Sequence, residues 1–247
     1  MDLLKREKAP ILPEAWKLID DEASRVLKLH LAGRKVVDFD GPHGWKKAAV
    51  NTGRLDLLGT EPVAGVSVGR RRVVPLIEVR TPIRLDLMDL DTVARVEDLA
   101  IFHGYDAAGI QGIVPASPHA PIAVPSAQAW PQAVAAAKEV LRQAGVDGPY
   151  ALVASPKGYD ELATSIDDGY PIRKRIVPSI IDELIWAPAI EHAVLLSTRG
   201  GDFELTVGQD LSIGYAYREK HEVELYLTES FTFRVLEPAA AIALKRG

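Results

Sequence analysis

The feature that most restricts the fold is a long extended segment, residues 54–82, which carries many charges and few apolar side chains. Polar residues alternate with Leu55 and Leu57, a turn follows over Gly59–Gly65, and apolar residues then return as far as Ile77. This pattern predicts a long β-hairpin. A two-stranded hairpin without its own core is marginally stable in isolation. We therefore expect it to pack on another subunit.

The remaining periodicity indicates a mixture of helices and strands. Apolar residues recur at helical spacing over Pro13–Leu31, and Gly33 is a suitable stop. The arm ahead of this helix, residues 1–12, is too short to fold alone and is expected to lie on another surface. A second, Ala-rich helix is expected at Trp130–Ala144. Short strands are expected at Tyr150–Ala154, Ile185–Trp186, Ala193–Ser197, Val223–Leu227 and Phe231–Val235. The elements do not alternate as βαβ units, so the fold class is α+β.

Composition excludes several classes of protein. The 247 residues include no cysteine, which excludes a disulfide scaffold, a thiolate zinc site, an iron–sulfur cluster and a cysteine nucleophile. A formal charge of −5 is poorly suited to coating nucleic acid. Residues 1–6 lack the apolar run of a signal peptide, and no stretch approaches the roughly 18 apolar residues of a membrane span. We expect a soluble, cytoplasmic protein that binds neither nucleic acid nor membrane.

Motifs for catalysis are weak. Gly65–Gly69 matches the G-x-S-x-G pattern with Ser67 as nucleophile, but that motif needs a helix to begin at the serine. Strand-like residues and Pro75 follow instead, so a glycine-flanked strand is the better interpretation. No two of the six histidines stand three or four residues apart, so none forms a local metal pair. The chain is expected to have no catalytic residue, no metal site and no cofactor.

Three polar groups have simple structural interpretations. His103 follows Glu97-Asp98 at a spacing that allows a carboxylate–histidine contact around a helix end. The basic run Arg70–Arg72 could touch phosphate, but the acidic total favours a solvated or inter-subunit role. Asp167–Pro171 has the composition of a loop. Its adjacent carboxylates could line an opening or simply lie in a solvated turn.

A set of sequence blocks together points to one family. The blocks are Leu4–Arg6, Ala9-Pro10, Trp16, Ile19-Asp20, Gly33–Lys35, Val37-Asp38, Gly41–Trp45, Pro75–Arg80, Glu97-Asp98, Ile101–Gly104, Gly109–Gly112, Gly148–Tyr150, Arg199–Asp202, Gly208–Tyr215 and Glu229–Phe233. On these residues the chain resembles the encapsulins, a family once called linocin-type bacteriocins. The resemblance runs nearly end to end, and Gly208–Tyr215 with the N-terminal blocks is its most specific part.

The resemblance implies a fold. It is the α+β, tailed-phage (HK97-like) major capsid fold, with a peripheral domain, an axial domain and an extended loop. The expected division has five segments: arm and helix of the peripheral domain at 1–45, extended-loop hairpin at 46–82, a shortened spine-helix region at 83–115, axial domain at 116–215, and C-terminal strands returning to the peripheral domain and extended-loop region at 216–247. Burial between subunits would then explain why the hairpin lacks a core.

The resemblance also implies a function. Encapsulins form closed icosahedral shells in the cytoplasm, and we expect a homo-oligomer of the smallest class, with roughly 60 copies. The shell would enclose a ferritin-like protein or a dye-decolorising peroxidase, held by that enzyme's C-terminal targeting peptide, and would admit small ions for iron storage or oxidative-stress defence. The rival interpretations are a phage-type capsid protein, which would favour a basic interior, and a bacteriocin or protease, which would need a secretion signal or a catalytic constellation.

Two sites follow from the resemblance by position. Docking of the cargo peptide would fall on Leu27, Leu31, Arg34 and Asp38, although both leucines could equally be core residues. The loop of Asp167, Asp168, Gly169 and Tyr170 resembles the family's pore loop at the five-fold axis. Carboxylates near such an opening would attract cations.

One segment departs from the family pattern. Between Leu90 and Glu97 the chain is shorter by roughly twenty residues, which corresponds to about 30 Å of helix. A natural deletion, an engineered deletion or residues missing from the sequence could each explain this. A shell subunit should tolerate a deletion in its main helix poorly, so we favour missing residues. A break is then expected between Leu90 and Glu97, with successive Cα atoms much more than about 3.8 Å apart.

Overall fold

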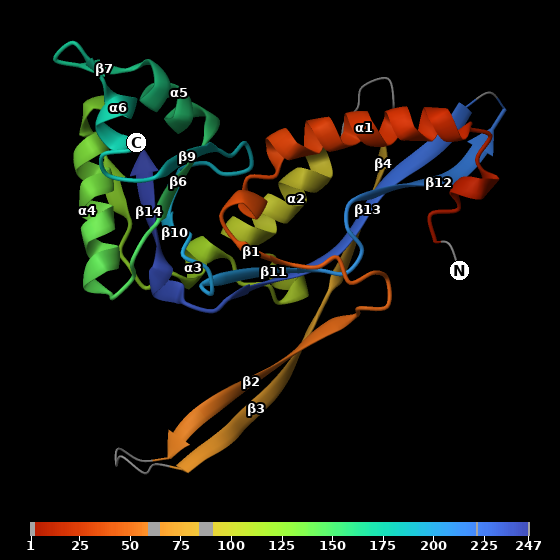
Figure 1. Ribbon diagram of the computed structural model, residues 1–247, viewed down its shortest axis with the longest axis horizontal. Coiled ribbons are helices and arrows are strands. Elements are labelled where there is room, and N and C mark those ends of the chain that lie inside the picture. Colours follow the sequence, from red (N-terminus) through yellow and green to blue (C-terminus); the bar gives the residue numbers. More distant parts are fainter. Residues whose placement is uncertain (1–2, 59–64, 84–90, 221, 247) are drawn as a thin grey trace.

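The computed structural model describes residues 3–58, 65–83, 91–220 and 222–246. Two sheet-centred units lie side by side, and a hairpin projects from one of them (Figure 1). The helices are α1 (Pro13–His30), α2 (Asp91–Phe102), α3 (Ile113–Ala116), α4 (Trp130–Gln143), α5 (Pro156–Thr164) and α6 (Ile172–Ile176), with short 3-10 turns at η1 (Arg6–Lys8), η2 (Gly33–Lys35), η3 (Asp106–Ala108), η4 (Ala127–Ala129) and η5 (Pro238–Ala240). The α+β class expected from the sequence is confirmed.

One unit is built on what we call the long sheet. Its strands are β1 (Asp38–Asp40), β11 (Phe203–Val207), β13 (Glu222–Val235), β12 (Ser212–Glu219) and β4 (Ile77–Ile83). Strand β13 is its axis, because it pairs with β11, β12 and β4 along different parts of its 14 residues. The two short strands expected around 223–235 are thus one strand. Its middle is buried even where the residues are polar.

Helices α1 and α2 cover the long sheet (Figure 1). Their apolar faces form a common core with β12 and β13, in which Trp16, Leu27, Val93, Ile213 and Leu227 are all buried. Pro13 begins α1 because it supplies a helical φ and no N–H that the first turn would leave unpaired. The predicted helix over residues 13–31 is confirmed to within one residue.

The N-terminal arm packs on the same subunit. The N–H of Tyr215 donates to the Leu4 carbonyl (2.8 Å) and the Tyr226 hydroxyl donates to the Leu3 carbonyl (2.9 Å). Arg6 donates to the Ile213 carbonyl (2.7 Å), and its guanidinium pairs with Asp20 of α1. The described part of the arm therefore lies on its own strand β12 and on α1.

The spine helix is short and unbroken. Helix α2 runs continuously from Asp91 to Phe102, a length of about 18 Å. The chain break that we expected between Leu90 and Glu97 is therefore wrong for residues 91–97, and Leu90 lies outside the described residues. The C-terminal end of this helix is firmly anchored, because Ala100, Ile101 and Phe102 are buried in the core between the two units.

The other unit is built on the compact sheet. Its strands run in the order β5 (Ile122–Val124), β14 (Ala241–Arg246), β10 (Ala193–Ser197), β6 (Tyr150–Ala154) and β9 (Glu183–Trp186). Strands β6 and β10 are buried along their whole length, which explains their continuous apolar sequences. Helices α4 and α5 lie against this sheet, and α6 packs on both of them (Figure 1).

The projecting hairpin consists of β2 (Ala49–Leu58) and β3 (Gly65–Pro75). It begins earlier and ends earlier than the expected span of 54–82, because residues 77–83 form β4 and pair with β13 instead. It extends away from both sheets (Figure 1). Val73 at its base is 63% exposed, so the hairpin gains little burial within the subunit.

The expected division of the chain needs correction at its C-terminal end. Strand β11 and the first half of β12 fall within 116–215, the segment expected to be axial, but both strands lie in the long sheet. Strand β14 falls within 216–247, the segment expected to return to the peripheral domain, but it is an internal strand of the compact sheet. The chain therefore passes between the two units more often than a simple succession of segments allows.

Candidate functional site

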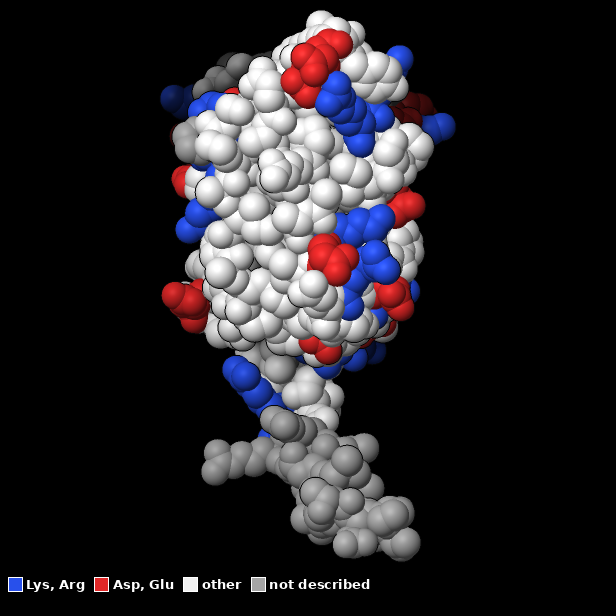
Figure 2. Space-filling model, turned by 90° about the vertical axis from the view of Figure 1, so that its left-hand side faces the viewer, with Lys and Arg blue, Asp and Glu red and all other residues white. Residues whose placement is uncertain are grey.

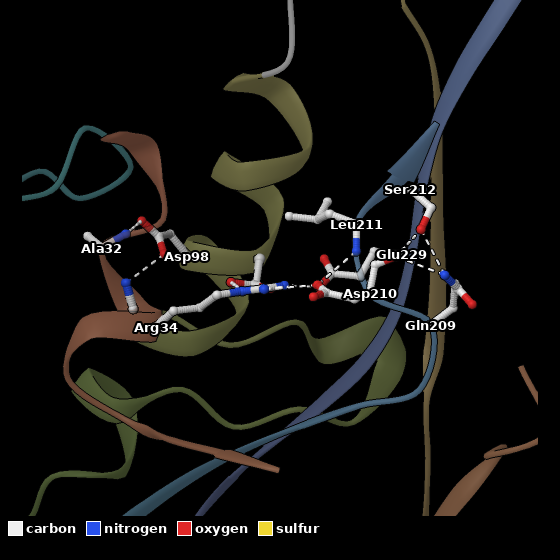
Figure 3. A network of polar contacts seen from close by, with 10 residues as sticks. Ala32, Arg34, Asp98, Gln209, Asp210, Leu211, Ser212 and Glu229 are labelled. Carbon is white, nitrogen blue, oxygen red and sulfur yellow. Dashed lines mark hydrogen bonds and ion pairs between the residues drawn. The ribbon is translucent and has the colours of Figure 1, made fainter. Parts of the chain in front are cut away.

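A buried network of charged side chains joins four distant parts of the chain (Figure 3). At its centre is Arg34 of η2. Its Nε donates to both carboxylate oxygens of Glu97 in α2 (2.9 and 3.0 Å), and its Nη2 donates to Glu97 (2.7 Å) and to Glu229 of β13 (2.5 Å). Its Nη1 donates to Asp210 in the β11–β12 loop (2.9 Å). One guanidinium therefore holds three carboxylates.

The carboxylates of the network differ in burial. Glu97 and Glu229 are fully buried, whereas the Asp210 side chain is 39% exposed. Burial raises the pKa of Glu229 well above its usual value, and the neighbouring Glu97 carboxylate raises it further, both by its charge and by accepting a hydrogen bond from the protonated form. Arg34 opposes this shift. Burial and the neighbouring charge therefore favour the protonated form of Glu229.

A second buried carboxylate, Asp98, lies one residue further along α2. It accepts hydrogen bonds from the N–H groups of Ala32 (3.0 Å) and Gly33 (2.8 Å). Burial raises the pKa of Asp98 to about 7, although the two backbone hydrogen bonds lower it. Gly33 has no room for a side chain, because a Cβ there would lie 2.5 Å from Ile101 Cδ1. The contact between α2 and the segment after α1 thus depends on the small size of Gly33 and on the carboxylate of Asp98.

The block Gly208–Tyr215 supplies the other side of the network. Asp210 is fixed by the Leu211 N–H (2.8 Å), and the Gln209 side-chain amide donates to the Ser212 hydroxyl (2.7 Å). Gly208 packs on the Ser230 hydroxyl, where a Cβ would lie 2.6 Å from Oγ. The β11–β12 loop therefore packs closely on β13 beside Glu229.

The four residues expected to dock a cargo peptide do not form one exposed surface. Leu27 and Leu31 are 6% and 7% exposed and belong to the core between α1 and the long sheet, as their alternative interpretation required. Arg34 is occupied by the buried network. Asp38 lies in β1, where its carboxylate accepts the Gly201 N–H (2.6 Å).

Two openings nevertheless touch these residues. A groove of about 300 Å³ runs between the arm, α1 and the loop before β12, and Arg6, Asp20, Leu27 and Ile213 line it. A smaller hollow of about 90 Å³ lies beside Asp38 and is lined mainly by η2, β1 and the turn before β11. Of the four expected docking residues, Leu27 thus borders the groove and Asp38 borders the separate hollow.

The expected pore residues form a tight hairpin. Strands β7 (Ile166–Asp167) and β8 (Tyr170–Pro171) pair, and both turn residues have positive φ, 48° at Asp168 and 75° at Gly169. This is the backbone of a two-residue turn in which glycine is favoured. Tyr170 is 49% exposed. The loop predicted from the sequence is therefore a well-defined turn, and Tyr170 beside it is exposed to solvent.

The charge of this hairpin is more balanced than expected. Asp167 forms an ion pair with Arg175 of α6 (2.7 Å). Arg173 and Lys174 are exposed beside it, and Asp168 has no ion-pair partner among the described residues. Acidic and basic side chains lie next to one another at the top of the face in Figure 2, over this hairpin and α6. That this loop lines a pore stays a prediction, in which Asp167 would contribute a carboxylate already paired with Arg175.

The catalytic interpretations find no support in the backbone. Ser67 lies inside strand β3, not at the start of a helix. Asp98 and Glu97 bond to the segment after α1 and not to His103, so the expected carboxylate–histidine contact is wrong. Burial lowers the pKa of His103, while Glu191 opposes this. Within the described ranges, no group of three or more His, Asp or Glu side chains could hold a metal ion, and no helix is long and apolar enough to cross a membrane.

Before the structure, Arg34 was expected to dock a cargo peptide and Glu97-Asp98 to contact His103, and no role was predicted for Asp210 or Glu229. Glu97, Asp98, Asp210 and Glu229 each stand in a block that carried the resemblance. The signal that could have drawn attention to them is an acid among mostly apolar neighbours, as for Glu97-Asp98 ahead of Leu99–Phe102. Their common partner was not evident, because Arg34 precedes Glu97 by 63 residues and Glu229 by 195.

Comparison with known proteins places the chain among shell proteins. Residues 1–232 match the family model described as an encapsulating protein for peroxidase. The type 1 encapsulin shell protein of Brevibacterium linens is 44% identical over 265 aligned residues, covering 99% of both chains. That of Rhodospirillum rubrum is 43% identical over 271, covering 99% of this chain and 97% of the relative. The first alignment exceeds the 247 residues of this chain by 18 positions, consistent with a shortened segment.

Solved structures show the same fold. A virus-like particle protein from Pyrococcus furiosus aligns with a TM-score of 0.65 at 12% identity, covering 94% of this chain and all of that one. The Mycobacterium phage Cain protein aligns with a TM-score of 0.57 at 16% identity, covering 88% and 90%. The fold is therefore the HK97-like capsid fold. The relatives are named as shell proteins and not as enzymes.

Proposed function

We propose, because this chain belongs to the encapsulin family of shell proteins, that its copies assemble into a closed icosahedral shell around a cargo enzyme. The observation that carries the proposal is the match at 40–44% identity along 99% of the chain. Phage capsid proteins share the fold at only 10–16% identity, so the phage alternative has weaker support. A bacteriocin or protease has none in the site geometry.

Two surfaces of the subunit support assembly. The β2–β3 hairpin projects with exposed side chains at its base and two free strand edges, which can be stabilised by a neighbouring copy. The middle of the face in Figure 2 carries few charged side chains, which suits it to packing between subunits. Contacts between unlike surfaces close into a shell when their rotations match an icosahedron. We propose the smallest class, with roughly 60 copies.

The proposed cargo is a dye-decolorising peroxidase or a ferritin-like protein, held through a C-terminal targeting peptide. The family's description as an encapsulating protein for peroxidase favours the first. The peptide would enter the groove beside Leu27, which offers apolar side chains flanked by Arg6 and Asp20, or the hollow beside Asp38. Iron storage or oxidative-stress defence in the cytoplasm, with ions entering past Asp168, completes the proposal.

Assembly is tested by negative-stain microscopy and light scattering of the purified full chain. We expect uniform hollow particles. A chain lacking the hairpin segment 51–73 should remain folded and form small oligomers only. A monodisperse small oligomer of the complete chain would refute the proposal.

Cargo loading is tested by co-expressing the shell with a peroxidase that carries or lacks its C-terminal peptide. Ser24→Trp in the groove beside Leu27 should reduce co-purification if the peptide binds there, whereas Thr198→Trp should do so if it binds beside Asp38. Each variant is the control for the other. Loading that is unaffected by removing the peptide would contradict the docking proposal while leaving shell assembly untouched.

A further inference from the structure

The two fully buried glutamates have one cation between them. Glu97 and Glu229 are each 0% exposed, and Arg34 is the side chain that pairs with both. Oxygen Oε2 of Glu229 is buried and accepts no hydrogen bond from the residues that the structure describes. A buried carboxylate oxygen without a donor is costly, and a proton on it removes that cost. Protonated Glu229 can donate to Glu97 and still accept from Arg34.

The position of this pair makes its proton consequential. Arg34 lies in η2, the three-residue turn that connects α1 to β1. The side-chain partners that hold Arg34 are on α2, on β13 and in the β11–β12 loop. Figure 3 shows the Arg34 side chain reaching from η2 across to Asp210 and Glu229. Weakening this one contact therefore loosens the end of α1 from three other elements at once.

We propose that Glu229 and Glu97 form a proton-dependent latch, which fixes the α1–η2 junction to the long sheet while the pair is protonated and releases it when the proton is lost. Loss of the proton leaves two buried negative charges against one guanidinium. Opening the junction lets water reach the second charge. Acid therefore closes the latch and alkali opens it.

The charged groups around the pair agree with this direction. Asp210, from the β11–β12 loop, adds a third negative charge near Glu229 and favours keeping the proton. Asp98, on the same helix as Glu97, repels it electrostatically. Lys35 acts on Asp98, and Arg34 is the cation that contacts the pair directly. The basic groups come from η2, and the acidic groups come from α2 and the β11–β12 loop.

The test is hydrogen–deuterium exchange of the assembled full chain from pH 5 to pH 9, corrected for intrinsic exchange. If opening releases one proton, protection of residues 31–38 in the wild type should fall by up to tenfold per pH unit. Glu229→Gln keeps an acceptor for Arg34 and a donor for Glu97 without a titrating proton. Asp98, which accepts the Ala32 and Gly33 N–H groups, titrates near pH 7 in both proteins. Above that pH, protection in this variant should become nearly independent of pH and should exceed that of the wild type at pH 9.

Asp210→Asn is the matched control, since it removes a partly exposed partner of the same arginine. It should lower protection of residues 31–38 with little change in slope. Glu97→Gln is a second neutralising variant, for use if Glu229→Gln assembles poorly, and it should flatten the profile likewise. A slope in either glutamine variant equal to that of the wild type would overturn the proposal, as would a uniform loss of protection at every pH. Either result would leave the proposal of shell assembly standing.

Discussion

Gly214 of β12 should tolerate no side chain, because it packs against the ring of Tyr226 on β13. A Cβ at this position would lie 2.7 Å from Tyr226 Cε1 and closer still to the phenol carbon and oxygen. The ring has little room to move. Its hydroxyl donates to the Leu3 carbonyl of the arm, and the Arg80 guanidinium lies 3.5 Å from the ring centroid. Gly214→Ala should therefore displace the ring and detach the arm.

The magnitude follows from the contacts that are lost. Overpacking a core position costs about 1–3 kcal/mol, and loss of the Tyr226–Leu3 hydrogen bond adds about 1 kcal/mol. We expect Gly214→Ala to lower the free energy of unfolding by about 2–4 kcal/mol in denaturant titrations. Release of the arm should also speed tryptic cleavage after Lys5 and Arg6, since Arg6 is held by the Ile213 carbonyl and Asp20 in the intact subunit.

A double-mutant cycle separates the clash from any effect of the backbone. In a Tyr226→Ala background the obstructing ring is absent, so Gly214→Ala should be neutral or slightly stabilising, as an alanine restricts the unfolded chain. If Gly214→Ala costs the same in both backgrounds, Tyr226 is not the reason for the glycine. Unchanged tryptic cleavage of the arm would contradict the proposed link between this glycine and the N-terminus.

Three further outcomes are expected. Burial raises the pKa of Asp98 to about 7, so the folded chain keeps a proton that the unfolded chain releases near pH 4. The free energy of unfolding should therefore fall as pH rises from about 4 to about 7. Asp98→Asn should flatten this profile by up to about 4 kcal/mol in denaturant titrations. Asp168→Asn should slow iron(II) entry into ferritin-loaded shells at low salt more than Asp167→Asn, whose charge Arg175 already balances; equal effects would refute this. Ser67→Ala should leave any esterase or protease activity measured in cargo-free shells unchanged. A loss of that activity in the variant would contradict this prediction.

The sequence predicted best those elements whose burial is uniform. Tyr150–Ala154 and Ala193–Ser197 are continuous apolar runs because both faces of these strands are covered, and both were identified to the residue. Strand β13 was split in two because Thr228, Glu229 and Ser230 read as a polar interruption. These residues are buried through partners on other strands, such as the Val79 carbonyl that accepts from the Thr228 hydroxyl (3.1 Å). Pattern along a strand cannot reveal such partners.

The charged network was beyond sequence reasoning for a related reason. A buried acid is recognised by its cation, and Arg34 is separated from Asp210 by 176 residues. The resemblance supplied the blocks that meet there, without saying that they meet. It also suggested a docking role for Leu27 and Leu31, both of which the structure buries in the core between α1 and the long sheet.

Strand β14 has a consequence for how the protein is made. It is an interior strand of the compact sheet, between β5 and β10, and the axis of the long sheet, β13, ends only at Val235. During synthesis the long sheet cannot be completed before Val235 has left the ribosome, nor the compact sheet before Arg246. Nascent chains interrupted before residue 241 must expose the buried edge of β10 and are substrates for chaperones and proteases. For a shell protein this order of synthesis acts as quality control, because a chain released early has not formed the complete surface that assembly requires.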